Sequence, residues 1–117
     1  MTTGTIRSKI AGVTAKNDDG KFRQDYIRAF CKPGMPLILR REPDNKYDRN
    51  AISIWIKAKV LLIFSNEVKI GYINTGLAEE LARWLEKGHN ISGEIIDVTG
   101  GTNDKSSLGV NIKLVKT

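Results

Sequence analysis

Short runs of alternating apolar and polar residues dominate the chain, and a period of two is typical of β-strands. The alternation is clearest over residues 51–56, where three isoleucines fall on one face and Ser53 and Trp55 fall on the other. The same pattern predicts strands over residues 5–14, 36–41, 51–56, 60–64, 68–73, 91–98 and 108–115. The fourth and fifth of these strands look like a hairpin that turns near Asn66 and Glu67.

Two segments instead repeat their apolar residues at helical spacing. In the first, the large apolar residues of positions 22–30 share one helical face, and the following Lys-Pro-Gly ends the helix. In the second, leucines recur every four residues over 77–87, and Gly88 caps the helix. Six or seven strands with two short helices predict a mainly β fold, an antiparallel OB-like or partly open β-barrel, because closure protects strand edges.

The length of 117 residues and the mass of 13.0 kDa match one domain spanning residues 1–117. Hydrophobic residues make up 40% and charged residues 27%, which excludes a disordered tail, a collagen or a membrane bundle. The longest apolar run, from Val60 to Phe64, is too short to span a bilayer, and no secretion signal is visible at the amino terminus. We therefore expect a cytoplasmic protein that does not bind a membrane.

The net charge of +6 is unevenly distributed. Residues 1–50 hold 11 basic and 6 acidic side chains, so +5 of the charge lies in the first half. A basic face attracts polyanions, and nucleic-acid binding of this kind weakens as salt is added. Charge alone does not show that the chain binds nucleic acid, since many basic domains carry solvated lysines and have no polyanionic partner.

Residues able to carry covalent or metal chemistry are scarce. Cys31 is the only cysteine, which excludes an intramolecular disulfide and a cysteine-pair zinc site, so we interpret it as a small buried hydrophobe. The only histidine, His89, follows Gly88 in a predicted loop without catalytic partners. Gly100 and Gly101 lack the helix and the Lys-Ser or Lys-Thr ending of a P-loop. We therefore expect neither a cofactor nor a metal ion.

The polar segment between the predicted strands 36–41 and 51–56 concentrates charge, amides and one aromatic ring. Its basic side chains can neutralise phosphate, Tyr47 can stack on a base or sugar, and Asn45 can hydrogen-bond to base edges. Alternatively, the polar side chains of the loop form Asx turns that accept loop amides, at Asp44, Asn45, Asp48 and Asn50, while Tyr47 covers the end of the barrel. From the residue types alone, both interpretations stay open.

An enzymatic interpretation of the same loop rests on its carboxylates. Glu42, Asp44 and Asp48 could hold magnesium for phosphodiester cleavage. Their spacing is unspecific, neighbouring basic side chains could neutralise them instead, and no base or water-orienting group is identifiable. The sequence therefore favours a protein that is not an enzyme over a metal-dependent nuclease.

Residues 41–52 read Arg-Glu-Pro-Asp-Asn-Lys-Tyr-Asp-Arg-Asn-Ala-Ile. This segment resembles the Arg-Glu-Pro-x-Asn-x-Tyr-Asp-x-Asn-Ala-Ile motif of the HIRAN family, small domains found fused to Swi/Snf-type ATPases and as stand-alone bacterial proteins. Supporting matches follow in the family order at residues 10–14, 70–73, 77–78, 100–101 and 109–112. Together the matches cover nearly the whole chain and make it similar to a stand-alone bacterial-type member.

The resemblance implies an OB-related antiparallel barrel with two helices and a site for the 3′ end of single-stranded DNA. In family members that bind DNA this way, an Asn, a Tyr and an Asp of the loop help to hold the terminal nucleotides, and they match Asn45, Tyr47 and Asp48. A carboxylate at Asp48 would accept a hydrogen bond from a free 3′ hydroxyl and would repel a 3′ phosphate.

Further contacts are expected outside these three loop residues. Arg40, Arg41 and Lys16 are candidates for phosphate contacts, and Lys16 and Tyr72 are candidates for the rim of the site. DNA-binding members related to the helicase-like factors carry an Arg and two aromatics where this chain has Thr14, Ala15 and Lys16. Two stacking groups of those relatives are therefore missing.

By the same resemblance, the partners would be single-stranded DNA or DNA 3′ ends and a helicase or ATPase, in DNA repair or replication-fork processing. The competing hypothesis is a protein-interaction module in which the family fold persists but docks a partner chain. The apolar strand from Val60 to Phe64, if exposed at an edge, could pair with a second copy of the chain. This alternative predicts a homodimer through that strand and no nucleic-acid ligand.

Overall fold

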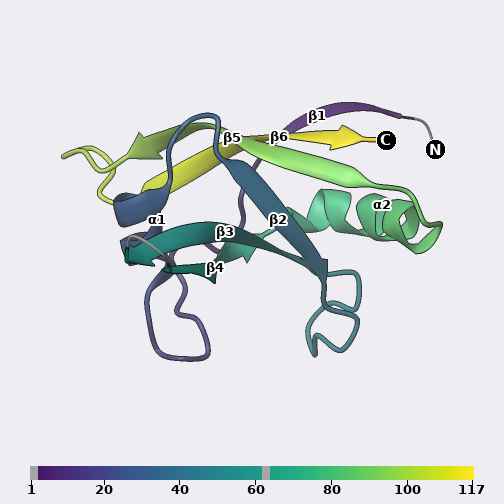
Figure 1. Cartoon of the computed structure of the whole chain (residues 1–117), viewed down its shortest axis with the longest axis horizontal. Helices are drawn as coiled ribbons and strands as arrows, with labels where there is room; N and C mark the ends of the chain where they lie inside the picture. The colour runs from purple at the N-terminus through teal and green to yellow at the C-terminus, as the bar shows by residue number, and fades with distance from the viewer. Residues whose placement is uncertain (1–2, 62–63) are drawn as a thin grey trace.

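The computed structural model describes residues 3–61 and 64–117. Within this part of the chain, six strands and two helices follow one another (Figure 1). In chain order they are β1 (Gly4–Lys9), α1 (Arg23–Phe30), β2 (Pro36–Arg41), β3 (Ile52–Leu61), β4 (Phe64–Tyr72), α2 (Thr75–Glu86), β5 (Ile91–Gly100) and β6 (Leu108–Lys116). The predicted mainly β fold with two helices is confirmed. Neither described helix is long and apolar enough to cross a membrane.

The strands form one antiparallel sheet in the order β1-β6-β5-β2-β3-β4. The sheet curls so that β1, β5 and β6 lie in one layer and β3 and β4 in the other, with β2 crossing between them (Figure 1). Just beyond β1, Ala11 bridges to Tyr72 of β4, and their backbone groups exchange hydrogen bonds of 2.8 and 2.9 Å. The result is a partly open barrel with Tyr72 at its seam.

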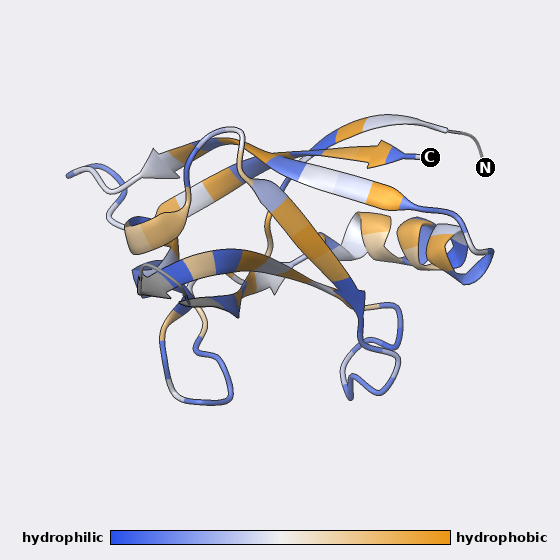
Figure 2. Cartoon of the chain, in the orientation of Figure 1, coloured by the Kyte–Doolittle hydropathy of each residue, from blue (hydrophilic) through white to orange (hydrophobic). Residues whose placement is uncertain are grey.

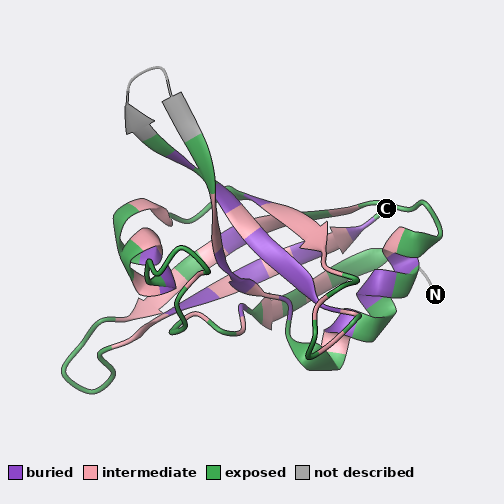
Figure 3. Ribbon diagram, turned by 90° about the horizontal axis from the view of Figure 1, so that it is seen from below, coloured by how far each residue is buried: buried purple, intermediate pink, exposed green. Residues whose placement is uncertain are grey.

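The apolar faces of the two layers meet in one core (Figures 2 and 3). The inward side of β3 supplies Ile52, Ile54 and Ile56, which are fully buried. Ile27 of α1 and Leu81 of α2 are also fully buried and belong to the same cluster. Since each such side chain contributes roughly 1.5–3 kcal/mol when it leaves water, this core holds the loops at its rim in place.

β1 is shorter than the strand predicted over residues 5–14, because the chain ends its regular pairing with β6 at Lys9. The backbone amide of Ile10 still donates to Val110 of β6 at 3.0 Å, but Ala11 already pairs with β4. The segment that follows therefore runs along the seam of the barrel rather than along the sheet.

The hairpin of β3 and β4 is longer than predicted. β3 does not break in its middle, because the alternation of inward and outward residues persists and Ala58 is buried. The predicted turn at Asn66 and Glu67 is wrong, since both residues pair with β3 from within β4. The apolar strand from Val60 to Phe64, on which the predicted homodimer depends, includes residues 62–63, which lie outside the described residues.

Cys31 follows α1 and packs its partly buried side chain against the core. Burial raises the pKa of the thiol to about 11, so the group is protonated at neutral pH. Because the thiolate is the reactive form, we expect iodoacetamide at neutral pH to modify Cys31 far more slowly in the folded protein than in urea. Mass spectrometry of timed samples measures both rates, and equal rates would contradict a buried thiol.

Candidate nucleic-acid interface

The loop between β2 and β3 is held by hydrogen bonds from its own side chains to its backbone. Asn45 Oδ1 accepts hydrogen bonds from the backbone amides of Tyr47 (2.9 Å) and Asp48 (3.1 Å). Asp48 Oδ1 in turn accepts one from the backbone amide of Asn50 at 2.9 Å. One interpretation of the sequence predicted Asx turns at four positions, and the structure shows them at two of these, Asn45 and Asp48. They fix the course of the loop.

Tyr47 projects from the tip of this loop with 87% of its surface exposed. The prediction that its ring covers the end of the barrel is therefore wrong. Lys46 Nζ lies 5.2 Å from the centre of the ring, so the aromatic surface stands beside a positive charge. An exposed tyrosine on a fixed turn is available for stacking.

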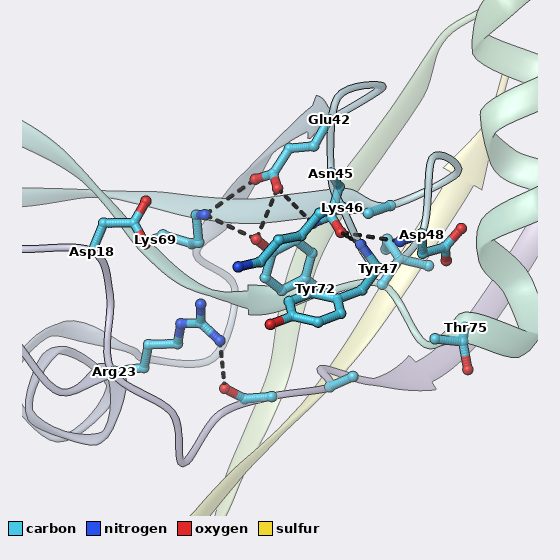
Figure 4. A pocket seen from close by; sticks show the side chains of 14 residues that line it. Asp18, Arg23, Glu42, Asn45, Lys46, Tyr47, Asp48, Lys69, Tyr72 and Thr75 are labelled. Carbon is cyan, nitrogen blue, oxygen red and sulfur yellow. Dashed lines mark hydrogen bonds and ion pairs between the residues drawn. The ribbon is translucent and has the colours of Figure 1, made fainter.

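The loop forms one wall of a pocket of about 500 Å³ (Figure 4). The opposite wall comes from the segment after β1 and from Arg23 of α1, and the floor comes from the end of β4. The residues that line the pocket are Ala11, Gly12, Asp18, Arg23, Glu42, Asn45, Lys46, Tyr47, Asp48, Ala51, Lys69, Tyr72, Ile73 and Thr75. The pocket therefore lies at the seam where the two edges of the sheet meet.

A hydrogen-bonded network of Glu42, Lys69 and Tyr72 occupies one side of the pocket (Figure 4). The hydroxyl of Tyr72 donates to Glu42 Oε1 at 2.8 Å, and Lys69 Nζ donates to Tyr72 Oη at 3.0 Å. Lys69 Nζ also lies 3.1 Å from Glu42 Oε2, and Asn45 Nδ2 donates to Glu42 Oε1 at 3.1 Å. The network links the fixed loop to β4 and holds the Tyr72 ring in one orientation.

Burial alone would raise the pKa of Glu42, but the hydrogen bonds from Tyr72, Asn45 and Lys69 outweigh it and lower that pKa below the ordinary value. Burial would likewise lower the pKa of Lys69, but its bonds to Tyr72 and Glu42 raise it. Both groups are therefore held charged near neutral pH.

This ion pair makes stability depend on pH. A lowered pKa of Glu42 stabilises the fold above the ordinary carboxyl pKa, and the contribution is lost as pH falls through the folded value. We expect Glu42→Gln to cost about 1 kcal/mol of unfolding free energy at pH 7, with the difference from the wild type shrinking below about pH 4. Urea denaturation at both pH values measures this difference, and a difference that does not change with pH would contradict it.

Arg23, like Lys69, lines the pocket although the sequence pattern missed it. Only 7% of it is exposed, and its guanidinium carbon lies 5.3 Å from the centre of the Tyr72 ring. It donates from Nη1 to the carbonyl of Gly12 at 2.8 Å and from Nε to Asn17 Oδ1 at 2.8 Å. These partners are neutral, and Arg23 makes no ion pair with any described residue. Its positive charge is thus not neutralised by a carboxylate.

The charges around the pocket balance. Three cationic side chains line it, and so do three carboxylates; they are Arg23, Lys46 and Lys69, and Asp18, Glu42 and Asp48. A dense phosphate cradle would carry an excess of positive charge, whereas this lining suits a largely neutral group with aromatic surface. Such a pocket can hold a base and its sugar, with phosphate at the edge.

Four of the residues predicted from the sequence lie together in this pocket, namely Asn45, Tyr47, Asp48 and Tyr72. The other three lie outside its lining. Arg41 Nη2 pairs with Glu86 Oε1 of α2 at 2.8 Å, and Arg40 pairs with Glu67 of β4. Lys16 Nζ lies 4.9 Å from the centre of the exposed Phe22 ring.

Of the carboxylates that the nuclease hypothesis requires, Glu42 and Asp48 line the pocket and Asp44 does not. Glu42 is occupied by its hydrogen bonds to Tyr72, Lys69 and Asn45. Across residues 3–61 and 64–117, no three His, Cys, Asp or Glu side chains are grouped so that they could hold a metal ion.

Two solved structures share this fold. The crystal structure of the HIRAN domain of human HLTF aligns with a TM-score of 0.64 and 20% identity, covering 97% of this chain and 74% of that one. A crystal structure of a protein from Lactobacillus plantarum aligns with a TM-score of 0.62 and 21% identity, covering 99% of this chain and 100% of that one. No curated protein matches the sequence.

The family is shown by the sequence itself. The model of the family described as HIRAN domain matches residues 4–115, which is nearly the entire chain. The predicted resemblance, carried by the loop motif between β2 and β3, is confirmed by that match and agrees with the fold of the HLTF domain. This chain belongs to the HIRAN domain family.

Proposed function

We propose that this chain is a non-enzymatic module that binds single-stranded DNA and recognises its 3′ end. HIRAN domains are known generally as DNA-binding modules, and the chain belongs to that family. The observation that carries the proposal is the exposed Tyr47 ring on a backbone turn held by Asn45, at the mouth of a pocket lined by aromatic side chains and balanced charges. By family resemblance we place the module in DNA repair or replication-fork processing, with a helicase or ATPase as partner. The cytoplasm remains the expected compartment from the sequence alone.

Four side chains of the pocket have a chemical role in this proposal. Tyr47 stacks on the terminal base, and Tyr72 supports the sugar or base from the floor. Asp48 Oδ1 is engaged by the Asn50 amide, while Oδ2 makes no hydrogen bond with a described residue and is free to accept one from a 3′ hydroxyl. Arg23 supplies the positive charge for the first phosphate, and Lys16, Arg40 and Arg41 lie farther along the surface.

The test compares single strands that differ only at the 3′ end. Oligonucleotides labelled at the 5′ end, with a 3′ hydroxyl or a 3′ phosphate, are titrated by fluorescence anisotropy at fixed salt. We expect the phosphate to weaken binding by about tenfold, because it places negative charge against Asp48. Equal affinity for the two ends would remove end recognition from the proposal.

Replacing Tyr47 tests the stacking role directly. Each stacked base contributes on the order of 1–3 kcal/mol, so Tyr47→Ala is expected to weaken binding by about 10- to 100-fold, while Tyr47→Phe retains most of the affinity. Because the side chain is 87% exposed, neither variant should alter thermal unfolding. A folded Tyr47→Ala variant that binds as well as the wild type would overturn the assigned role.

A further inference from the structure

The outward face of β3 carries a row of side chains that the pocket does not use. Inward positions of this strand are isoleucines and an alanine, whereas the alternate positions hold the fully buried Ser53 and then Trp55, Lys57 and Lys59, which are partly or fully exposed. Tyr72 of the pocket is the cross-strand partner of Ser53, and Lys69 of the pocket is the partner of Trp55, so the accessible row begins at Trp55 beside the pocket and runs away from it. Two residues of a strand advance about 6.8 Å, so Trp55, Lys57 and Lys59 follow one another along a track at about this spacing, between the irregularities of pairing at Ile54/Trp55 and Lys59/Leu61.

A second hollow continues the pocket along this track. It has a volume of about 200 Å³ and shares Asp18 and Lys69 with the pocket. Trp55 forms part of its wall, together with Tyr26 of α1 and Val68 of β4. Lys69 therefore lies between the two hollows, and the indole ring of Trp55 lines the second hollow next to it.

Positive charge accompanies the aromatic surface. The guanidinium carbon of Arg40 lies 4.5 Å from the centre of the Trp55 ring, and Lys69 Nζ lies 5.5 Å from it. Farther along β3, Lys57 and Lys59 are exposed and make no ion pair with any described residue. Alternating aromatic and cationic groups of this kind form the usual platform for an unpaired strand.

The acidic neighbours of the track are compatible with this occupant. Glu67 pairs with Arg40, but the two side chains are 37% and 41% exposed, and ion pairs in water contribute little. A phosphate can therefore replace Glu67 as the partner of Arg40. Asp18 and Asp19 line the hollow itself, where they would face base amino groups rather than phosphates.

We propose that single-stranded DNA, continuing 5′ from the terminal nucleotides in the pocket, follows the outward face of β3 and stacks a base on Trp55, with its phosphates beside Arg40, Lys57 and Lys59. The inference rests on the proposed function and extends it from the strand terminus to the strand body. It assigns Trp55 to binding, and it makes affinity depend on strand length.

A length series separates this inference from the proposed function. Oligothymidines with a free 3′ hydroxyl, from a dinucleotide to an octanucleotide, are titrated against the wild type and against Trp55→Ala and Trp55→Phe. We expect the octanucleotide to bind the wild type at least about fivefold more tightly than the dinucleotide. Trp55→Ala should lose this gain without weakening the dinucleotide, and Trp55→Phe should keep it.

The lysines of the track give a second readout. Each phosphate contact removed should reduce the slope of log affinity against log salt by roughly 0.7 for a single strand. Lys57→Ala and Lys59→Ala should show this reduction with the octanucleotide and not with the dinucleotide. Arg7→Ala, which removes an exposed cation from β1, is the matched control and should leave both slopes unchanged.

The chain contains two tryptophans, so fluorescence can report Trp55 alone. In Trp84→Phe, which replaces the buried indole of α2, quenching by the octanucleotide but not by the dinucleotide would support the track. If the dinucleotide and the octanucleotide bind the wild type equally, or if Trp55→Ala weakens both alike, the proposed path along β3 is wrong. The proposed binding of the 3′ end is not contradicted by either result. If neither strand binds, the proposed function fails as well.

Discussion

Replacing Gly71 with alanine is expected to lower the free energy of unfolding by about 3 kcal/mol, because the added methyl group would overlap its neighbours at the seam of the barrel. A Cβ at this position would lie 2.5 Å from the carbonyl oxygen of Ala11 and would also overlap the side chain of Ile10. The carbonyl belongs to the bridge between Ala11 and Tyr72, which joins the two edges of the sheet. The added methyl group therefore forces the seam apart.

Gly4→Ala is the matched control for this prediction. Gly4 and Gly71 have nearly the same backbone angle, φ 158° and 159°, but nothing lies within 4 Å of a Cβ at Gly4. Any cost of the backbone conformation is common to both variants, so their difference isolates the steric contact. Urea denaturation gives both unfolding free energies. Equal losses for Gly4→Ala and Gly71→Ala would show that the close approach at the seam does not matter.

The fold was largely predictable because its signals are local. Alternation along β3, β4, β5 and β6 and the leucine spacing of α2 each reflect which side of an element faces the core. The errors arose where long-range contacts decide where a strand ends or turns. β1 ends early because Ala11 pairs with β4, and Asn66 and Glu67 pair with β3 although both are polar and asparagine favours turns. Neither partner is visible in a local pattern.

The residues of the candidate site show the same difference between local and long-range signals. Asn45, Tyr47 and Asp48 are close in sequence, so one motif brings them together. Arg23 and Lys69 reach the pocket from α1 and β4, and only the folded chain shows that they meet there. The sequence did contain a signal for Arg23. This residue is charged, yet it belongs to the helix whose apolar face was predicted to pack on the core.

The two arginines predicted to contact phosphate show that residue type alone does not tell which face of a strand a side chain occupies. Arg41 faces α2 and pairs with Glu86, so its place next to the loop motif does not direct it into the pocket. Arg40 lies on the opposite side of β2, in contact with Trp55 and Glu67. Successive residues of a strand point to opposite faces, which separates two neighbouring arginines that the charge count treats alike.

The second large effect is expected at Asn45, whose replacement by alanine should weaken binding of a 3′ hydroxyl strand by about 10- to 100-fold. The side chain makes three hydrogen bonds, to the amides of Tyr47 and Asp48 and to the carboxylate of Glu42. Without them the loop must be ordered when DNA binds, and fixing each residue costs roughly 1–2 kcal/mol. Fluorescence anisotropy measures the loss. Asp44→Asn, in the same loop but outside the pocket, should change affinity by less than about twofold.

A double-mutant cycle decides whether Asn45 acts through the position of Tyr47. If the amide serves to hold the ring over the pocket, Tyr47→Ala already removes the group that it positions. The double variant Asn45→Ala with Tyr47→Ala should then bind nearly as well as the weaker of the two single variants. Fully additive losses would mean instead that Asn45 acts apart from the ring, either through Asp48, whose backbone amide it also holds, or by contacting DNA itself. Repeating the cycle with Asp48→Ala in place of Tyr47→Ala separates these two roles, because only positioning of Asp48 makes the losses of that pair less than additive.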